Sequence, residues 1–124
     1  MIKGIGIDIV ETDRIRDAVQ KWGDKFLNKI FNDIEISYCN KKKNIYECFA
    51  ARFAAKEAFI KALSDLEYDG EMPRLTNIVI LNHASGKPCI SVREDLAERH
   101  VINLSISHER HYAVAMVILE STKK

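Results

Sequence analysis

Residues 46–65, YECFAARFAAKEAFIKALSD, are the stretch that decides the fold. The stretch is rich in alanine and in long straight side chains, which lose little rotamer freedom in a helix. Apolar residues recur along it at helical spacing, and a polar break over residues 41–44 precedes it. We therefore expect one long helix here, the strongest of the chain.

Four charged residues occupy defined sides of this helix. On a helical wheel, its apolar stripe consists of Phe49, Phe53 and Ile60, with Ala50, Ala54 and Ala58 beside it. Glu57 and Lys61 fall between or within these apolar positions, so we expect both charges to point toward the core. Arg52 and Lys56 lie toward the other flank, where we expect the helix to meet solvent or a phosphate.

The beginning of the chain predicts a strand with one face almost bare of side chains. Residues 2–10 alternate with a period of two, which is typical of a strand. The side chains on one face are Ile5, Ile7 and Ile9, and those on the other are Gly4, Gly6 and Asp8. If the glycine face packs across the long helix, Asp8 comes close to Glu57.

The pairing of Asp8 with Glu57 favours a metal site. A carboxylate on an apolar helix face costs about several kcal/mol unless it is compensated. A Glu57–Lys61 pair one turn apart contributes only about 0.3–0.5 kcal/mol. Two carboxylates together with substrate phosphates are the usual oxygen ligands of Mg²⁺ in proteins. Taken alone, Asp8 is equally well a turn or capping residue, and the pairing is what favours a metal–phosphate site.

The remaining segments predict an α+β domain. Thr12 and Asp13 are expected to cap a helix that stops at Gly23, with short helical pieces up to Phe31. The other expected elements are a loop over residues 66–74, strands over 77–81 and 89–92, a short helix over 94–99, and a central hairpin of 101–107 with 112–119. We expect a single domain over residues 1–124, with an antiparallel sheet packed against the long helix.

Composition excludes several classes of protein. The 124 residues are 47% hydrophobic and 30% charged, which fits a folded domain rather than a disordered or fibrous chain. A net charge of +1 provides no overall field for nucleic acid or an anionic membrane. The longest apolar run, residues 112–119, is far shorter than the roughly 20 residues that cross a bilayer. Because the N-terminus lacks a secretory signal pattern, we expect a cytoplasmic protein.

The cysteines favour a reduced protein. Cys39, Cys48 and Cys89 are odd in number and form no Cys-x-x-Cys pair. This pattern argues against a disulfide framework and against a structural zinc site. We therefore expect three free thiols in a reducing compartment.

Four segments of the chain resemble the signature blocks of the holo-acyl-carrier-protein synthases, in that family's order. The blocks are residues 4–11 with 13–15, residues 52–58 with 61–63, residues 86–88, and residues 104–108. The resemblance spans nearly the whole chain and implies the 4'-phosphopantetheinyl transferase fold. Ser64 stands where a glycine is expected, and the segment over residues 65–75 does not match the family.

The resemblance also implies an activity and its residues. A carrier serine attacks the β-phosphate of coenzyme A, 3',5'-ADP leaves, and Glu57 takes the serine proton directly or through a metal-bound water. Asp8 and Glu57 bind Mg²⁺ with the pyrophosphate, and together with Lys61 they are the implied catalytic residues. The residues implied to lie around the nucleotide are Lys61, Gly86, Lys87, Pro88 and His108. The family further implies fatty acid biosynthesis and a homotrimer with active sites between subunits.

Some of these residues also have a simpler interpretation. Residues 86–88 are too short for a phosphate loop and alone predict a plain turn. His108 follows a strand and either hydrogen-bonds within the turn or contacts the nucleotide. The lysines at 41–43 are either a solvated loop or an attraction for the 3'-phosphate of coenzyme A. We expect the other three histidines, His83, His100 and His111, to lie at the surface.

A basic strip on the early helices is the predicted contact for the acyl carrier protein. Its residues are Arg14, Lys21, Lys25 and Lys29. Because acyl carrier proteins are acidic, such a strip would steer docking, and salt would weaken it. Arg14 is the strongest candidate, since it belongs to the first block.

Two other functions use the same residues. A Mg²⁺-dependent nucleotide hydrolase would use the two carboxylates with water as the nucleophile. A non-catalytic subunit would bind coenzyme A and do nothing further. The full set of four blocks argues against both, and product formation with and without a carrier protein would distinguish all three.

Overall fold

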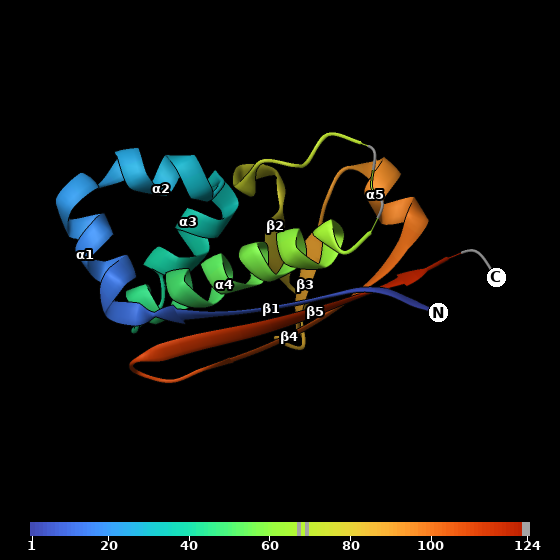
Figure 1. The fold of residues 1–124 in the computed structure, drawn as a ribbon. Helices are drawn as coiled ribbons and strands as arrows, with labels where there is room; N and C mark the ends of the chain where they lie inside the picture. The colour runs from blue at the N-terminus through green and yellow to red at the C-terminus, as the bar shows by residue number, and fades with distance from the viewer. Residues whose placement is uncertain (67, 69, 123–124) are drawn as a thin grey trace.

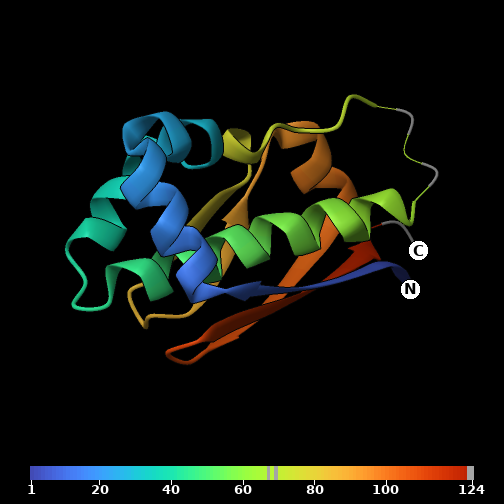
Figure 2. The ribbon, with the colours of Figure 1, turned by 60° about the vertical axis from the view of Figure 1, so that its left-hand side comes forward.

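The computed structural model describes residues 1–66, 68 and 70–122. Figures 1 and 2 show the long helix α4 (Ile45–Ser64) lying along a sheet, with the helices that precede it in the chain gathered around its first half. The elements in chain order are β1 (Ile2–Glu11), α1 (Thr12–Trp22), α2 (Asp24–Ile30), α3 (Asp33–Asn40), α4 (Ile45–Ser64), the 3-10 helix η1 (Leu75–Asn77), β2 (Val79–Asn82), β3 (Pro88–Ser91), α5 (Glu94–Arg99), β4 (His100–His108) and β5 (Tyr112–Ser121).

The main sheet is antiparallel with the order β1-β5-β4, so β5 is its central strand. Asp8 of β1 lies opposite Ala115 of β5, and His108 of β4 lies opposite Ala113. Strands β2 and β3 pair separately as a second antiparallel sheet. The predicted hairpin, the helix at 94–99 and the antiparallel sheet against a long helix are therefore confirmed. The predicted loop over residues 66–74 contains no helix or strand where it is described, and Glu67 and Asp69 lie outside the described residues.

Two glycines allow β1 to lie directly against α4. A Cβ on Gly6 would lie 1.8 Å from the carbonyl oxygen of Ala58, and one on Gly4 would lie 2.1 Å from that of Ala62. Both distances are far inside van der Waals contact, so only glycine permits this approach. The bare face predicted from the sequence is thus the face that packs on the helix, and it carries Asp8 to the helix surface.

The opposite face of the sheet is apolar and exposed. Ile5, Ile7 and Ile9 retain 51%, 55% and 65% of their exposure. Their partners across β5 are Ile118, Met116 and Val114, which lie on the same outer face. Such a continuous apolar surface on a single chain is typical of a protein interface.

Helix α3 was not predicted from the sequence. Its start has a capping box, in which the Asn32 side chain accepts a hydrogen bond from the Glu35 backbone N–H and the Glu35 carboxylate accepts one from that of Asn32. An Asn followed three residues later by Glu is a recognised helix start. The signal was therefore present in the sequence.

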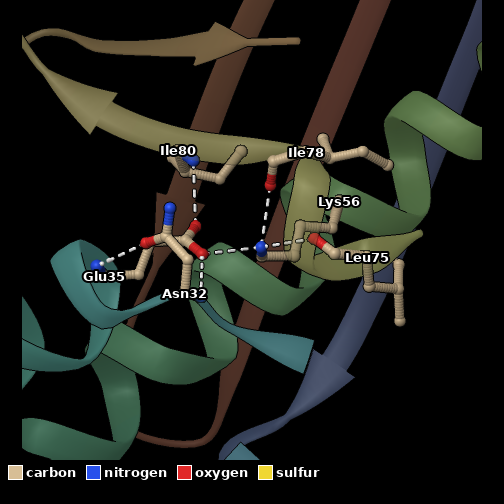
Figure 3. A network of polar contacts seen from close by, with 6 residues as sticks. All are labelled: Asn32, Glu35, Lys56, Leu75, Ile78 and Ile80. Atoms are coloured by element: carbon tan, nitrogen blue, oxygen red, sulfur yellow. Dashed lines mark hydrogen bonds and ion pairs between the residues drawn. The ribbon is translucent and has the colours of Figure 1, made fainter. Parts of the chain in front are cut away.

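The expected orientation of Lys56 was wrong. Its side chain is fully buried, and its Nζ lies 2.7 Å from Glu35 Oε1 and 2.7 Å from the carbonyl oxygens of Leu75 and Ile78 (Figure 3). Arg52 is also buried, at 5% exposure. The reason is that α3 and β2 cover the flank of α4 that we expected to face solvent or a phosphate, while the sheet covers the other flank.

The expectation of three free thiols was also wrong, because Cys39 and Cys48 form a disulfide and only Cys89 is free. The helix that was missed explains this outcome. Its last turn carries Cys39 to a Cα–Cα distance of 5.5 Å from Cys48 in the first turn of α4. That distance suits a disulfide.

Candidate active site

The structure brings Asp8 and Glu57 together across the β1–α4 contact. Burial raises the pKa of the Glu57 carboxyl, and the neighbouring negative charge of Asp8 raises it further, while Lys61 acts in the opposite direction. The charge of Asp8 thus raises the pKa of Glu57 across the contact between β1 and α4, which Gly4 and Gly6 keep narrow and which we call the seam. This is the convergence expected from the sequence.

Lys61 pairs with Asp8 instead of pointing into the core. Its Nζ lies 2.9 Å from Asp8 Oδ1 and 3.1 Å from the carbonyl oxygen of Ile7. The Lys61 side chain is 54% exposed, whereas the Asp8 side chain is only 16% exposed. The expected core orientation of Lys61 was therefore wrong, because its ammonium group turns to Asp8 and the Ile7 carbonyl oxygen of β1. Its ammonium group nevertheless belongs to the same cluster as the two carboxylates.

The chemistry of this cluster fits a hard cation. Within the described residues, no donor hydrogen-bonds the Glu57 carboxylate, so its oxygens are available as ligands. The same part of the chain contains no group of three or more His, Cys, Asp or Glu side chains suited to a metal ion. A cation held here would take only two carboxylates from this chain and its other ligands from water or substrate. Mg²⁺ bound by one or two carboxylates plus phosphates has this ligand set.

A pocket of about 550 Å³ opens beside the carboxylates, which we call the carboxylate pocket. The lining residues that matter here are Asp8, Glu57, Arg14, Phe26, Phe53 and Tyr112. Arg14 lies in α1, which begins directly after β1, so the chain turn that follows Asp8 also carries Arg14 to the pocket. The lining therefore combines charged side chains with aromatic ones.

A second pocket, of about 470 Å³, lies at the first half of α4, and we call it the basic pocket. Its lining includes Lys42, Lys43, Arg52, Gly86, Pro88 and His108. Three of the residues predicted around a nucleotide, Gly86, Pro88 and His108, are therefore neighbours. Lys87 is exposed and does not line this pocket.

Arg52 lines this pocket, although it was not among the predicted site residues. Its guanidinium lies 4.2 Å from the centre of the Tyr38 ring, and its Nη2 donates a 2.6 Å hydrogen bond to Asn82 Oδ1. Its buried Nε has no hydrogen-bond partner within the described residues. Burial lowers the pKa of the guanidinium, and Tyr38 and Glu35 partly oppose that effect. A buried cation that forms no ion pair with a carboxylate of the described chain is suited to an anionic ligand.

His108 faces this pocket from the end of β4. Its Nδ1 lies 3.5 Å from Glu47 Oε1, and its side chain is 48% exposed. The turn after it is held by Glu109, whose Oε1 accepts hydrogen bonds from the backbone N–H groups of His111 and Tyr112. Because Glu109 supplies these turn contacts, the His108 ring is not needed to hold the turn.

The two pockets share no lining residue. One chain therefore places the implied site residues in two groups, Asp8 with Glu57 and Lys61 in the first, and Gly86 with Pro88 and His108 in the second. The first group lies on β1 and α4, and the second lies on the β2–β3 turn, β3 and β4. The two groups do not line one common pocket within the described chain.

The predicted basic strip lies on α1 and α2. Lys21 Nζ is 5.0 Å from the centre of the Trp22 ring, and the Trp22 side chain is 55% exposed. Lys25 and Lys29 line a shallow pocket of about 260 Å³ together with Trp22 and Phe26. The strip thus combines positive charge with an exposed aromatic ring.

Comparison with known proteins identifies the family. Residues 4–117 match the family model described as the 4'-phosphopantetheinyl transferase superfamily. The chain belongs to this superfamily. It is 46% identical over 127 residues to the holo-[acyl-carrier-protein] synthase of Halothermothrix orenii, covering 97% of this chain and 98% of the relative. It is 45% identical over 121 residues to that of Chlamydia trachomatis, covering 94% and 98%.

Solved structures of the superfamily have the same fold. A holo-(acyl-carrier-protein) synthase of Bacillus anthracis in complex with CoA (3',5'-ADP) superimposes with a TM-score of 0.82 at 38% identity, covering 98% of this chain and 99% of that one. The enzyme of Neisseria meningitidis gives a TM-score of 0.84 at 32% identity, covering 98% and 100%. The fold implied by the sequence blocks is therefore confirmed.

No helix in the described part of this superfamily member is both long and apolar enough to cross a membrane.

Proposed function

We propose that this chain transfers the 4'-phosphopantetheine arm of coenzyme A to a serine of an apo-acyl carrier protein, a step of fatty acid biosynthesis. The observation that carries the proposal is the Asp8–Glu57 pair with Lys61 beside it, in a chain that matches named holo-[acyl-carrier-protein] synthases over nearly its whole length. Transfer of this kind needs mainly positioning and neutralisation of phosphate charge.

The basic pocket is the proposed nucleotide site. Its volume lies within the roughly 300–1,000 Å³ of small-molecule sites. Arg52, buried and without a carboxylate partner in the described chain, would receive the 3'-phosphate, with Lys42 and Lys43 at the rim. Gly86 and Pro88 would border the base, and His108 would contact the phosphate or the base. Lys87 stays a candidate through the family resemblance alone.

Asp8 and Glu57 are the proposed Mg²⁺ ligands. When bound, the ion would neutralise the pyrophosphate of coenzyme A. Lys61 would add a further positive charge at the same place, since its Nζ already lies on Asp8. Burial and the charge of Asp8 raise the pKa of Glu57, which makes its carboxylate a better proton acceptor than an exposed one.

The reaction balances with these residues. The carrier serine oxygen attacks the β-phosphorus, and the bond from that phosphorus to the bridging oxygen breaks. The electron pair leaves with 3',5'-ADP, and Glu57 takes the serine proton. Lys61 would hold the pyrophosphate end by its positive charge while the bond breaks, and Asp8 would hold the Lys61 ammonium in position.

The proposed assembly is a homotrimer whose active sites lie between subunits. Two observations support it. The carboxylate pocket and the basic pocket are separate in one chain, and the outer face of β1 and β5 exposes a continuous apolar surface. Pairing the basic pocket of one copy with the carboxylates of another would complete the site.

The acyl carrier protein is proposed to dock on α1 and α2. Arg14 at the carboxylate pocket and the exposed Lys21 and Lys25 would face its acidic surface. Because Arg14 lines the pocket that holds Asp8 and Glu57, a carrier bound there would bring its serine near the reacting phosphate. A cytoplasmic location is part of the proposal and rests on the family.

Intact mass spectrometry tests the proposed function. Apo-acyl carrier protein is incubated with this protein, coenzyme A and Mg²⁺, alongside a chelator control. We expect a metal-dependent mass gain of one phosphopantetheine arm. Release of 3',5'-ADP without any carrier would favour the hydrolase instead, and bound coenzyme A with no product would favour a non-catalytic subunit.

A further inference from the structure

The Cys39–Cys48 disulfide closes the loop that supplies the lysines of the basic pocket. Cys39 lies in the last turn of α3 and Cys48 in the first turn of α4, and the chain between them passes through Lys42, Lys43 and Asn44, all of which line the pocket. The crosslink therefore fixes both ends of this loop.

The two sulfurs differ in access. Cys39 is fully buried, whereas Cys48 is partly exposed and lines the basic pocket. A thiol from solvent therefore reaches Cys48 through the pocket. Positive charges from Lys42, Lys43 and Arg52 attract a thiolate to that position and favour anionic thiols such as glutathione.

We propose that Cys39–Cys48 is a redox-active disulfide, opened by thiol–disulfide exchange through the basic pocket, and that its state sets the affinity of that pocket for its nucleotide. A thiolate attacks Cys48 Sγ, the Cys39–Cys48 bond breaks, and Cys39 leaves with the electron pair and takes a proton from solvent. A second thiol attacks the mixed disulfide and frees Cys48. Two thiols are oxidised to one disulfide, and the protein gains two electrons and two protons.

The link from the disulfide to the pocket runs through Tyr38, the neighbour of Cys39. Lys42 Nζ lies 4.5 Å and the Arg52 guanidinium 4.2 Å from the centre of the Tyr38 ring. Holding Cys39 therefore holds the ring on which both cations rest. Reduction removes this constraint, so ligand binding must then order the loop. Because ordering the loop costs conformational entropy, we expect about tenfold weaker binding.

A disulfide of this kind suits a sensor. Disulfides in reducing compartments are usually transient and serve catalysis or redox sensing. In the reduced state the protein would bind its nucleotide weakly, and oxidation would tighten the pocket. The effect on nucleotide affinity rests on the proposed function, whereas the exchange chemistry does not.

The chemistry is tested by counting thiols. The Cys89→Ser protein is equilibrated in glutathione buffers from reducing to oxidising, alkylated, and measured by intact mass. We expect the number of alkylated thiols to change from two to none across the series, with one glutathione adduct on Cys48 at intermediate ratios. A disulfide that no buffer opens, or two thiols that never pair, would overturn the proposal.

The effect on the pocket is tested by calorimetry with 3',5'-ADP, which carries no thiol of its own. The oxidised and reduced Cys89→Ser proteins are compared with Cys39→Ser/Cys48→Ser/Cys89→Ser. We expect the oxidised protein to bind about tenfold more tightly than the reduced one, and the triple variant to match the reduced protein in either buffer. Equal affinities in both states would overturn the redox effect and leave the proposed function intact. Absence of binding in both states would overturn the nucleotide site as well.

Discussion

Lys56 Nζ lies 2.7 Å from Glu35 Oε1, and both side chains are fully buried. Glu35 also accepts hydrogen bonds from the backbone N–H groups of Asn32 and Ile80. The pair therefore joins the start of α3, the middle of α4 and strand β2 (Figure 3). Arg52 lies one helical turn before Lys56 and Asn82 two residues after Ile80, so the pair lies next in the chain to the Arg52–Asn82 hydrogen bond of the basic pocket.

The stability costs of removing the two members of this pair should not add. Lys56→Met leaves the Glu35 carboxylate buried and unpaired, which costs about 3–5 kcal/mol. Replacing both with apolar residues, as Glu35→Leu/Lys56→Met, removes the uncompensated charge. We expect the double variant to lose less free energy of unfolding than the sum of the single variants, measured by urea denaturation. Simple additivity would show that the two charges do not act as a pair.

A methyl group on Gly6 should separate the two carboxylates. The Cβ of Gly6→Ala would meet the carbonyl oxygen of Ala58 at 1.8 Å, so β1 has to move away from α4 and takes Asp8 with it. We expect a loss of about 1–3 kcal/mol or more of stability, as for other overpacked sites, together with loss of Mg²⁺-induced stabilisation.

Gly23→Ala is the matched control for Gly6→Ala. Gly23 has a positive φ of 56° but open space around its Cβ position, so the substitution strains the backbone without touching the seam. Thermal unfolding with and without Mg²⁺ distinguishes the variants. Gly23→Ala should lower the melting temperature and keep the shift with Mg²⁺. A Gly6→Ala protein that keeps this shift would refute the role given to the seam.

The parts of the fold that follow from local pattern were predictable, and those that depend on a missed helix were not. The helical spacing of apolar residues in the alanine-rich stretch 46–65 predicted α4. The alternation of glycine and isoleucine in residues 4–9 predicted that Asp8 lies on the face toward Glu57. The capping signal at Asn32 was overlooked, so α3 was missing from the prediction. Without α3, the flank of α4 with Lys56 looked solvent-facing, and Cys39 had no reason to lie near Cys48.

The candidate site shows the same division. Asp8 and Glu57 were predicted as a pair because a carboxylate on an apolar helix face needs a compensating partner, and the glycine face of β1 carries Asp8 toward Glu57. Arg52 was assigned to an exposed flank because a helical wheel shows only the direction in which each side chain leaves the helix. It does not show which other elements pack against that side. The separation into two pockets could not be predicted from the sequence either. Residue spacing does not determine which pocket is lined by a turn such as residues 86–88.

Glu57→Gln should remove most activity yet stabilise the metal-free protein at neutral pH. The folded state raises the pKa of Glu57, mainly through burial and then through Asp8, so ionisation costs more folded than unfolded. The protonated Glu57 carboxyl contributes its full stabilisation at pH values below the pKa that it has in the unfolded state. This contribution is lost as the pH rises through the pKa that it has in the folded state. The variant, which cannot ionise, should therefore exceed the wild type in stability from about pH 5 upward, and the two should converge near about pH 4.

Denaturant unfolding across this pH range, with and without Mg²⁺, checks the Glu57 prediction. In the wild type, bound Mg²⁺ should offset the repulsion between the two carboxylates and raise stability, whereas the variant should gain little. Glu57→Gln with full transferase activity would sink the proposed mechanism. A stability advantage that grows toward low pH would contradict the direction of the pKa shift.

Charge reversal on the basic strip should slow docking of the carrier. Lys25→Glu places a negative charge beside the exposed Trp22, so an acidic carrier should associate more slowly, with kcat/KM about tenfold lower at low salt. The difference should shrink as salt is added, because exposed charges are screened. Turnover at saturating carrier should change little. A defect that is equal at all salt concentrations would exclude electrostatic docking at this strip.

Arg52→Lys should weaken the basic pocket although it keeps the charge. The guanidinium is planar and lies against the Tyr38 ring while donating to Asn82, and an ammonium group cannot reproduce that geometry. Losing a charge-assisted hydrogen bond from a buried donor costs about 1.5–3 kcal/mol, or roughly 10- to 150-fold in the affinity for 3',5'-ADP. Arg99→Lys, on the exposed α5 and outside both pockets, is the control and should bind like the wild type. Calorimetry with 3',5'-ADP measures both, and equal affinities would place the phosphate contact elsewhere than Arg52.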